Sequence, residues 1–143
     1  MKTVFFELLS MDMFNFIVKH SKVCVLDFSA TWCGPCKKFA PLLEQTVEES
    51  ELKYHVFYNT NNFIVGDDTT QFTGDLHKLE KCVTFLKIDV DKFKELADKF
   101  NIKSVPTILF YVNGELKNIT PNGISLIDRA YSIIALSSEF LSN

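Results

Sequence analysis

Two cysteines, Cys33 and Cys36, are separated only by Gly34 and Pro35 and follow the apolar run 23–28 almost directly. Two thiols at this spacing can pass between a dithiol and an internal disulfide, and so carry a pair of electrons. The apolar run predicts a strand, and the residues after the pair predict a helix. The pair at this junction predicts thiol–disulfide exchange.

The helix after the cysteine pair would favour the ionised form of Cys33. Four apolar residues repeat at helical spacing and predict a helix that runs to about residue 50: Phe39, Leu42, Leu43 and Val47. Free N–H groups and the positive end of the helix dipole then lie beside Cys33 and lower its pKa below the usual value of about 8.5. Pro35 fits the first helical turn, where its missing N–H costs nothing. Cys33 is therefore the candidate nucleophile.

The stretch 27–37, DFSATWCGPCK, together with Val105-Pro106-Thr107, resembles the thioredoxin family. The resemblance covers about residues 1–53 and 81–140 and leaves the segment between them unmatched. It implies an α/β thioredoxin fold, with a central mixed β-sheet flanked by helices on both faces. We expect one domain over 1–143, with an inserted hairpin or loop at about 53–81, between the active-site helix and the next strand.

The resemblance also implies roles for individual residues. Cys33 matches the attacking cysteine and Cys36 the resolving one. Asp27 matches a buried carboxylate that accepts the Cys36 proton through water, and burial would raise its pKa. Pro106 matches a cis-proline that faces the disulfide. The expected substrate-binding residues are Trp32, Gly34, Pro35, Val105 and Pro106.

Two positions depart from the family pattern. A lysine near the buried aspartate of bacterial members corresponds to Phe85, so Asp27 is expected to lack that partner. The groove glycine before the last helix falls on Asn122 or, with a shift of one residue, on Gly123. The shape of the substrate groove is the property that these departures change.

Other interpretations of the same residues stay open at this point. The cysteine pair could be half of a zinc site or a purely structural disulfide. A zinc site needs a second ligand pair, whereas the remaining candidates are scattered along the sequence: Cys24, Cys82, His20, His55 and His77. We therefore predict neither a metal nor a cofactor.

Asp27 could instead face solvent, and Trp32 could belong to the core. Cys24 and Cys82 lie in apolar runs and are expected to be inert core thiols. A second redox role for Cys82 is the alternative, because this residue borders the unmatched segment.

Composition narrows the class of protein. The chain has 143 residues, 47% of them hydrophobic, and a net charge of −3 without long blocks of either sign. This pattern favours protein partners over nucleic acid or a membrane surface, and no run reaches the eighteen or so apolar residues of a membrane helix. The N-terminus is interpreted as a strand over 3–8 rather than a signal peptide. We expect a monomer in a reducing compartment, the cytoplasm.

The remaining elements alternate between helix and strand. Ser10 is expected to cap a short helix that leads into a strand at 23–29, and Asp91 to cap a helix over 93–100. Strands are expected at 83–90, 104–112 and 115–120, the last two joined by the Asn113-Gly114 turn. Spacing predicts that the last helix packs through Ile124, Ile127, Tyr131 and Ile134.

The unmatched segment is interpreted as two short strands at 54–58 and 62–65, joined by a polar turn into a hairpin and followed by a loop at 66–70. Its five aromatic residues argue against a plain linker. The hairpin either packs on the core or forms an interaction surface. We hypothesise that the insertion restricts or directs the access of other proteins to the thiols.

The resemblance implies an enzyme that reduces protein disulfides through Cys33 and Cys36 and is recharged by an NADPH-dependent thioredoxin reductase. A different class of function is a redox adaptor or assembly subunit that binds a partner through the insertion at 53–81. A third is disulfide formation or isomerisation, whose catalysts usually carry a histidine before the second cysteine. Pro35 occupies that position here, which favours a reductant.

Overall fold

The computed structural model describes residues 3–52, 55–57, 63–65, 70–72, 76–117 and 124–143. Its centre is a six-stranded sheet in the order β3-β1-β6-β2-β7-β8. The strands are β1 (Thr3–Glu7), β2 (Val23–Ser29), β3 (His55–Phe57), β6 (Val83–Asp89), β7 (Thr107–Val112) and β8 (Glu115–Lys117). The first four strands of the order run parallel, and β7 and β8 are antiparallel to their neighbours. The expected mixed sheet is confirmed.

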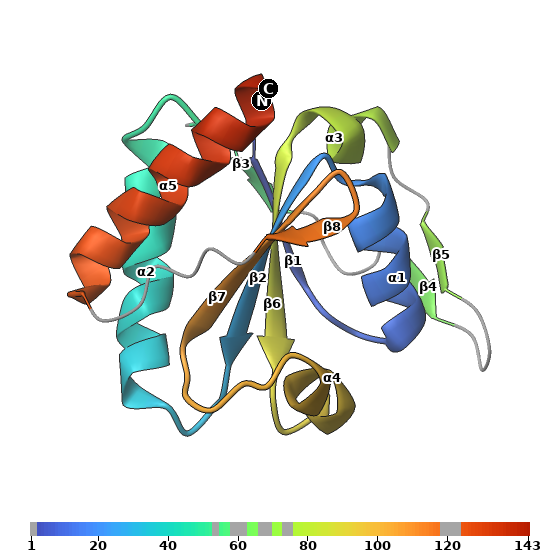
Figure 1. Ribbon diagram of the computed structural model, residues 1–143, viewed down its shortest axis with the longest axis horizontal. Coiled ribbons are helices and arrows are strands. Elements are labelled where there is room, and N and C mark those ends of the chain that lie inside the picture. The colour runs from blue at the N-terminus through green and yellow to red at the C-terminus, as the bar shows by residue number, and fades with distance from the viewer. Residues whose placement is uncertain (1–2, 53–54, 58–62, 66–69, 73–75, 118–123) are drawn as a thin grey trace.

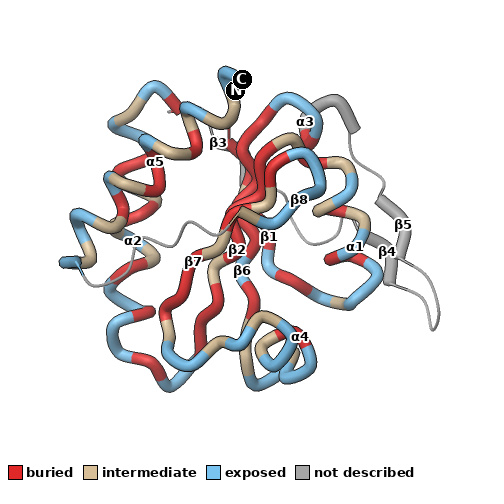
Figure 2. The backbone as a smooth tube through the Cα atoms, viewed as in Figure 1, coloured by how far each residue is buried: buried red, intermediate tan, exposed pale blue. Residues whose placement is uncertain are grey.

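Helices cover both faces of the sheet (Figure 1). One face carries α2 (Gly34–Glu48) and α5 (Leu126–Ser142), and the other carries α1 (Met11–His20), α3 (Leu76–Lys81) and α4 (Lys94–Lys99). Figure 2 shows the central strands buried between these layers, with exposed residues on the outer sides of the helices. The helices on both faces are also confirmed.

The residues of β2 point alternately to the two faces of the sheet and contribute to a hydrophobic core on each face. Val23 and Val25 belong to the cluster beneath α2 and α5, and Cys24, Leu26 and Phe28 belong to the cluster beneath α1 and α4. Successive strand residues point to opposite faces. Asp27 therefore shares the face of Val25, which is the face that α2 covers.

Local sequence signals set the ends of several elements as expected. The Ser10 hydroxyl accepts a hydrogen bond from the Met13 N–H at 3.1 Å and caps α1. Asn113 and Gly114 both have positive φ values, of 53° and 80°, as a two-residue hairpin turn requires. This turn joins β7 to β8, as predicted. Residues 118–120 of the expected last strand lie outside the described residues.

Two expectations about helices are wrong. Asp91 does not cap α4, which begins at Lys94 after Phe93. The Asp89 carboxylate instead accepts hydrogen bonds from the backbone N–H groups of Asp91 and Lys92, because β6 already ends at Asp89 and its side chain turns back over the loop.

The packed face of α5 matches the expected one only at Ile134, which is buried. Ile124, Ile127 and Tyr131 are exposed, Tyr131 by 56%. The buried residues of the helix are Ala130, Ile133, Ile134 and Ser137, at positions i, i+3, i+4 and i+7. Because α5 carries apolar residues on two faces, the spacing of the larger side chains predicted the wrong buried face. The small residues on the buried face allow the helix to pack closely against α2.

The insertion forms strands, but the expected pairing is wrong. β3 does not pair with the next strand of the insertion; it adds to the central sheet, parallel to β1. The hairpin is made by β4 (Phe63–Val65) and β5 (Thr70–Phe72). Figure 1 places this hairpin beside α1, on the other side of the sheet from α2. The predicted turn at 59–61 and most of the predicted loop at 66–70 lie outside the described residues.

Within the described part of the chain, no helix combines the length and the apolar character that crossing a membrane requires.

Candidate active site

Cys33 and Cys36 lie at the start of α2 and are joined by a disulfide, with their Cα atoms 5.3 Å apart. Cys33 is the N-cap residue and Pro35 lies in the first turn. Both cysteines are largely buried, with exposed fractions of 3% and 8%. The sequence placed the pair correctly, because residue types and spacing alone determine where this helix begins.

The start of α2 stabilises negative charge on Cys33. Its sulfur accepts a hydrogen bond from the Cys36 N–H at 3.1 Å. The positive end of the helix dipole acts on the same atom. A thiolate at this position replaces a side-chain oxygen as the helix cap, so the reduced state of Cys33 is favoured as an anion.

The loop before β7 faces Cys33. The Val105–Pro106 peptide bond is cis, as the resemblance implied, and the Val105 carbonyl oxygen lies 3.7 Å from Cys33 Sγ. A cavity of about 140 Å³ adjoins this loop. It is lined by Trp32, Val90, Ile102, Lys103, Ser104 and Val105. Cys33 therefore lies beside a small, mainly apolar recess.

Trp32 is exposed rather than part of the core. Its side chain is 68% exposed, and its Nε1 donates a hydrogen bond to Asp91 Oδ2 at 2.9 Å. Asp91 therefore fixes the orientation of the indole at the edge of the 140 Å³ cavity. Gly34 and Pro35 are also exposed, on the outer side of the cysteine pair. Their roles in substrate binding remain predictions.

Asp27 is half-buried as a residue, and its Oδ1 atom is fully buried without a hydrogen-bond partner among the described residues. Burial raises the pKa of this carboxyl to about 6, and the positive charge of Lys87 opposes that rise. The alternative of a solvent-facing Asp27 is therefore wrong for the carboxylate itself.

Phe85 occupies the position of the family's lysine, as expected, but Asp27 has a different lysine nearby, Lys87. Phe85 stacks on Phe5, with ring centroids 4.8 Å apart. Lys87 lies two residues further along β6, on the same face, and is the register partner of Asp27 in the parallel β2–β6 pair. The sequence shows no sign of this pairing, because it follows from the register of two strands sixty residues apart.

Asp27 and Cys36 line two different cavities that share lining residues. The smaller, of about 100 Å³, is lined by Asp27, Lys87, Ala40 and Glu44 among others. The larger, of about 280 Å³, is lined by Cys36, Lys87, Ala40, Glu7 and Asp89 among others. They share Lys87 and Ala40, and each combines a mainly apolar lining with charged side chains. Cys36 and Asp27 therefore line two neighbouring cavities that have Lys87 and Ala40 in common.

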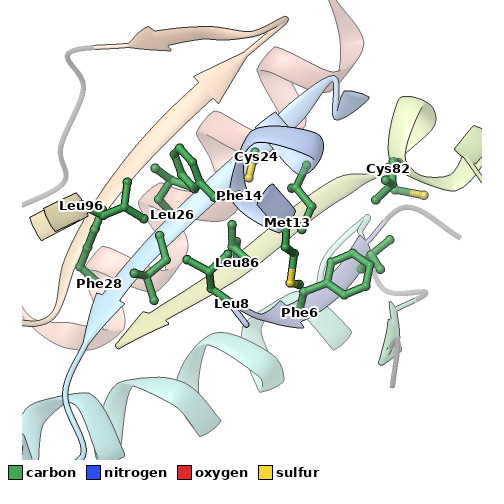
Figure 3. Close-up of a cluster of buried hydrophobic side chains, with 14 residues drawn as sticks. Phe6, Leu8, Met13, Phe14, Cys24, Leu26, Phe28, Cys82, Leu86 and Leu96 are labelled. Atoms are coloured by element: carbon green, nitrogen blue, oxygen red, sulfur yellow. The ribbon is translucent and has the colours of Figure 1, made fainter. Parts of the chain in front are cut away.

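Cys24 and Cys82 lie outside the disulfide, in the core beneath α1 (Figure 3). Their exposed fractions are 0% and 2%, and Figure 3 shows them apart within the cluster. Burial raises the pKa of the Cys24 thiol strongly. The prediction that both thiols are buried is confirmed.

Among the described residues, no group of three or more histidine, cysteine, aspartate or glutamate side chains is arranged to hold a metal ion. The groove position at Asn122 or Gly123 lies outside the described residues.

Comparisons with known proteins agree with this geometry. The thioredoxin family model matches residues 5–65 and 69–128. Thioredoxin-1 of Schizosaccharomyces pombe is 34% identical over 102 residues, which cover 71% of this chain and 70% of the relative. An H-type thioredoxin of Oryza sativa subsp. indica is 32% identical over 65% of this chain, and the match spans about half of that relative, 52%. The crystal structure of Schistosoma mansoni thioredoxin is 28% identical, has a TM-score of 0.60 and covers 95% of this chain and 94% of its own.

Proposed function

We propose that this chain, which belongs to the thioredoxin family and is a thiol–disulfide oxidoreductase, divides its work between Cys33 as nucleophile, Cys36 as resolving thiol and Asp27 as proton acceptor. The placement of the two sulfurs supports this division. Cys33 Sγ faces the Val105 carbonyl, whereas Cys36 lines the cavity that adjoins Asp27.

The first half of the reaction takes place at Cys33. Its thiolate attacks one sulfur of a disulfide in another protein, so a bond forms between Cys33 Sγ and that sulfur while the substrate disulfide breaks. The leaving substrate thiolate takes a proton from solvent. The hydrogen bond from the Cys36 N–H stabilises the attacking anion before the step.

The second half takes place at Cys36. Its thiol gives a proton through cavity water to the ionised Asp27 carboxylate, and the resulting thiolate attacks Cys33 Sγ. The mixed disulfide breaks, the second substrate sulfur leaves as a thiolate, and the Cys33–Cys36 disulfide forms. Two electrons have then moved from this chain to the substrate, and the product is the disulfide state of the structure.

The remaining assignments follow from kinship. Family membership implies disulfide-containing substrates and a thioredoxin reductase in general terms. We propose an NADPH-dependent reductase as the electron donor, Trp32, Gly34, Pro35, Val105 and Pro106 as the substrate-binding residues, and a monomer in the cytoplasm. The exposed Trp32 and the 140 Å³ cavity beside Val105 support the proposed binding surface.

A reduction assay with trapping variants tests the assignment of the cysteines. The protein should reduce insulin disulfides with dithiothreitol as donor, and Cys33→Ser should abolish this. Cys36→Ser should accumulate a mixed disulfide through Cys33, since the resolving thiol is missing. The matched control is the double variant Cys33→Ser/Cys36→Ser, which should trap nothing. Equal trapping by Cys33→Ser alone would overturn the assignment.

The adaptor function remains a separate prediction. β4 and β5 lie beside α1 and away from the start of α2 (Figure 1), so these strands leave the thiols open. This position concerns the hairpin alone, and the hypothesis that the insertion restricts or directs access to the thiols stays a prediction.

A further inference from the structure

Arg129 is the only arginine in a chain whose other fourteen basic residues are lysines. It is the fourth residue of α5, which begins at Leu126 after the Ser125 N-cap. The positive end of a helix disfavours a cation at this place. The local sequence of α5 therefore gives no reason for an arginine here.

The Arg129 side chain reaches out of α5 to the loop before β7. Its Nη1 donates a hydrogen bond to the Pro106 carbonyl oxygen at 3.0 Å. Its Nε is buried and has no hydrogen-bond partner within the described ranges. Withdrawing part of a guanidinium from water costs free energy unless other contacts offset that cost, so the bond to Pro106 is the contact that accounts for the position.

The loop that receives this bond is the one that faces the attacking sulfur. Val105, directly before Pro106, places its carbonyl oxygen 3.7 Å from Cys33 Sγ. The Thr107 hydroxyl donates to the Ser104 carbonyl at 2.6 Å, and Thr107 pairs with a residue of β2. The Thr107–Ser104 hydrogen bond holds the loop internally, and the pairing of Thr107 with β2 holds it to the sheet. Arg129 adds a third attachment, from α5.

We propose that Arg129 is a positioning residue that holds Val105 and Pro106 in place against Cys33, so that a substrate disulfide meets the sulfur in the right orientation. An arginine suits this task because its planar guanidinium donates in a fixed direction, whereas a lysine ammonium swings on a flexible stem. The catalytic part of this inference rests on the proposed function.

Hydrogen exchange of the oxidised protein tests the positioning directly. Arg129→Met should raise the exchange rates of the Val105 and Thr107 amides by roughly tenfold, the size expected when a hydrogen bond to a charged group is lost. Amides of β1 and β6 should keep their rates. The matched control is Lys19→Met, which removes one exposed cation from α1 and should change neither set. Arg129→Lys should return part of the protection.

Steady-state insulin reduction supplies the second measurement. Arg129→Met should raise the KM for insulin several-fold with a smaller change in kcat, because a displaced loop impairs substrate binding more than it impairs the thiols. Unchanged exchange at Val105 and Thr107, or an equal rise throughout the sheet, would overturn the inference, and so would an unchanged KM. A wild-type protein without insulin reduction would instead overturn the proposed function, while the exchange rates would still decide whether Arg129 holds the loop.

Discussion

Asp27 places a titratable group on the face of β2 that α2 covers. Its Oδ1 is buried, and burial raises the carboxyl pKa to about 6. The ionised form that can accept a proton from Cys36 is therefore the form that the fold disfavours. Folding therefore favours the protonated form of Asp27, whereas the proposed reaction needs the ionised form.

Asp27→Asn should stabilise the oxidised protein at pH 7 by about 1–3 kcal/mol. The raised pKa means that the folded state holds its proton while the unfolded chain releases it near pH 4. The contribution of the Asp27 carboxyl to the stability of the wild-type protein is therefore fully present below about pH 4 and is lost as the pH rises through about 6. Urea unfolding of both proteins between pH 4 and 8 measures the difference, which should grow across this window and then stay constant.

The control for this prediction is Asp98→Asn, which changes an exposed carboxylate on α4. Its stability difference from wild type should lack the step between pH 4 and 6. A difference for Asp27→Asn that is equal at pH 4 and pH 7 would show that Asp27 does not carry a raised pKa. The same variant should also slow the release of product from the mixed disulfide, because Cys36 loses its proton acceptor.

Lys87→Met should move the pH profile of insulin reduction to higher pH. Removing the cation that opposes the effect of burial raises the pKa of Asp27 further above its ordinary value, so the carboxylate becomes ionised only at higher pH. The measurement is kcat/KM from pH 5 to 9, with Lys87→Arg as the variant that keeps the charge. Lys38→Met, which removes an exposed cation outside both cavities, is the control. If Lys87→Met does not change the pH profile of kcat/KM, Lys87 does not influence the pKa of Asp27.

The sequence identified the residues whose chemistry is visible in their own type and spacing. Cys33 and Cys36 could be found in this way, because two residues separate them directly after a strand, and the family resemblance added Asp27. Lys87 and Arg129 could not. The position of Lys87 depends on the β2–β6 register, and that of Arg129 depends on how α5 crosses the loop before β7.

At the scale of elements, the sequence predicted where strands and helices lie better than what they contact. β2 runs over Val23–Ser29 as expected, because a continuous apolar run has no competing pattern. In α5, the spacing of large apolar residues predicted a face that is mostly exposed, and the buried face includes Ala130 and Ser137. The contacts that α5 makes with the rest of the molecule, and not the hydrophobicity of its residues, determine which face of the helix is buried.

The insertion shows the same limit. Its apolar segments predicted strands, but pairing depends on which free edge lies within reach. β1 offered an unpaired edge, and β3 occupies it. The expected local hairpin would have left that edge open. Sequence signals within the insertion contain no information about an edge formed by residues fifty positions earlier.

At the scale of the whole molecule, the two cores share one sheet. The cluster beneath α1 includes Leu79, which precedes β6, and the cluster beneath α5 includes Ile133. Both side chains have an exposed fraction of 0%. Because β2 and β6 contribute to both clusters, neither core can lose its packing without disturbing the strands that carry the other.

Leu79→Ala and Ile133→Ala should therefore each lower the stability of the entire molecule by about 2–5 kcal/mol, the usual cost of truncating a buried aliphatic side chain. Unfolding in urea should be followed by far-UV circular dichroism and by the fluorescence of Trp32, the only tryptophan. Trp32 lies beside the cysteine pair, outside both clusters, yet both signals should give one midpoint in each variant, since a single cooperative transition moves all probes together. If Leu79→Ala shifted the dichroism midpoint and left the Trp32 midpoint in place, the core beneath α1 would unfold independently, and the active site would draw its stability from the α2 and α5 side alone.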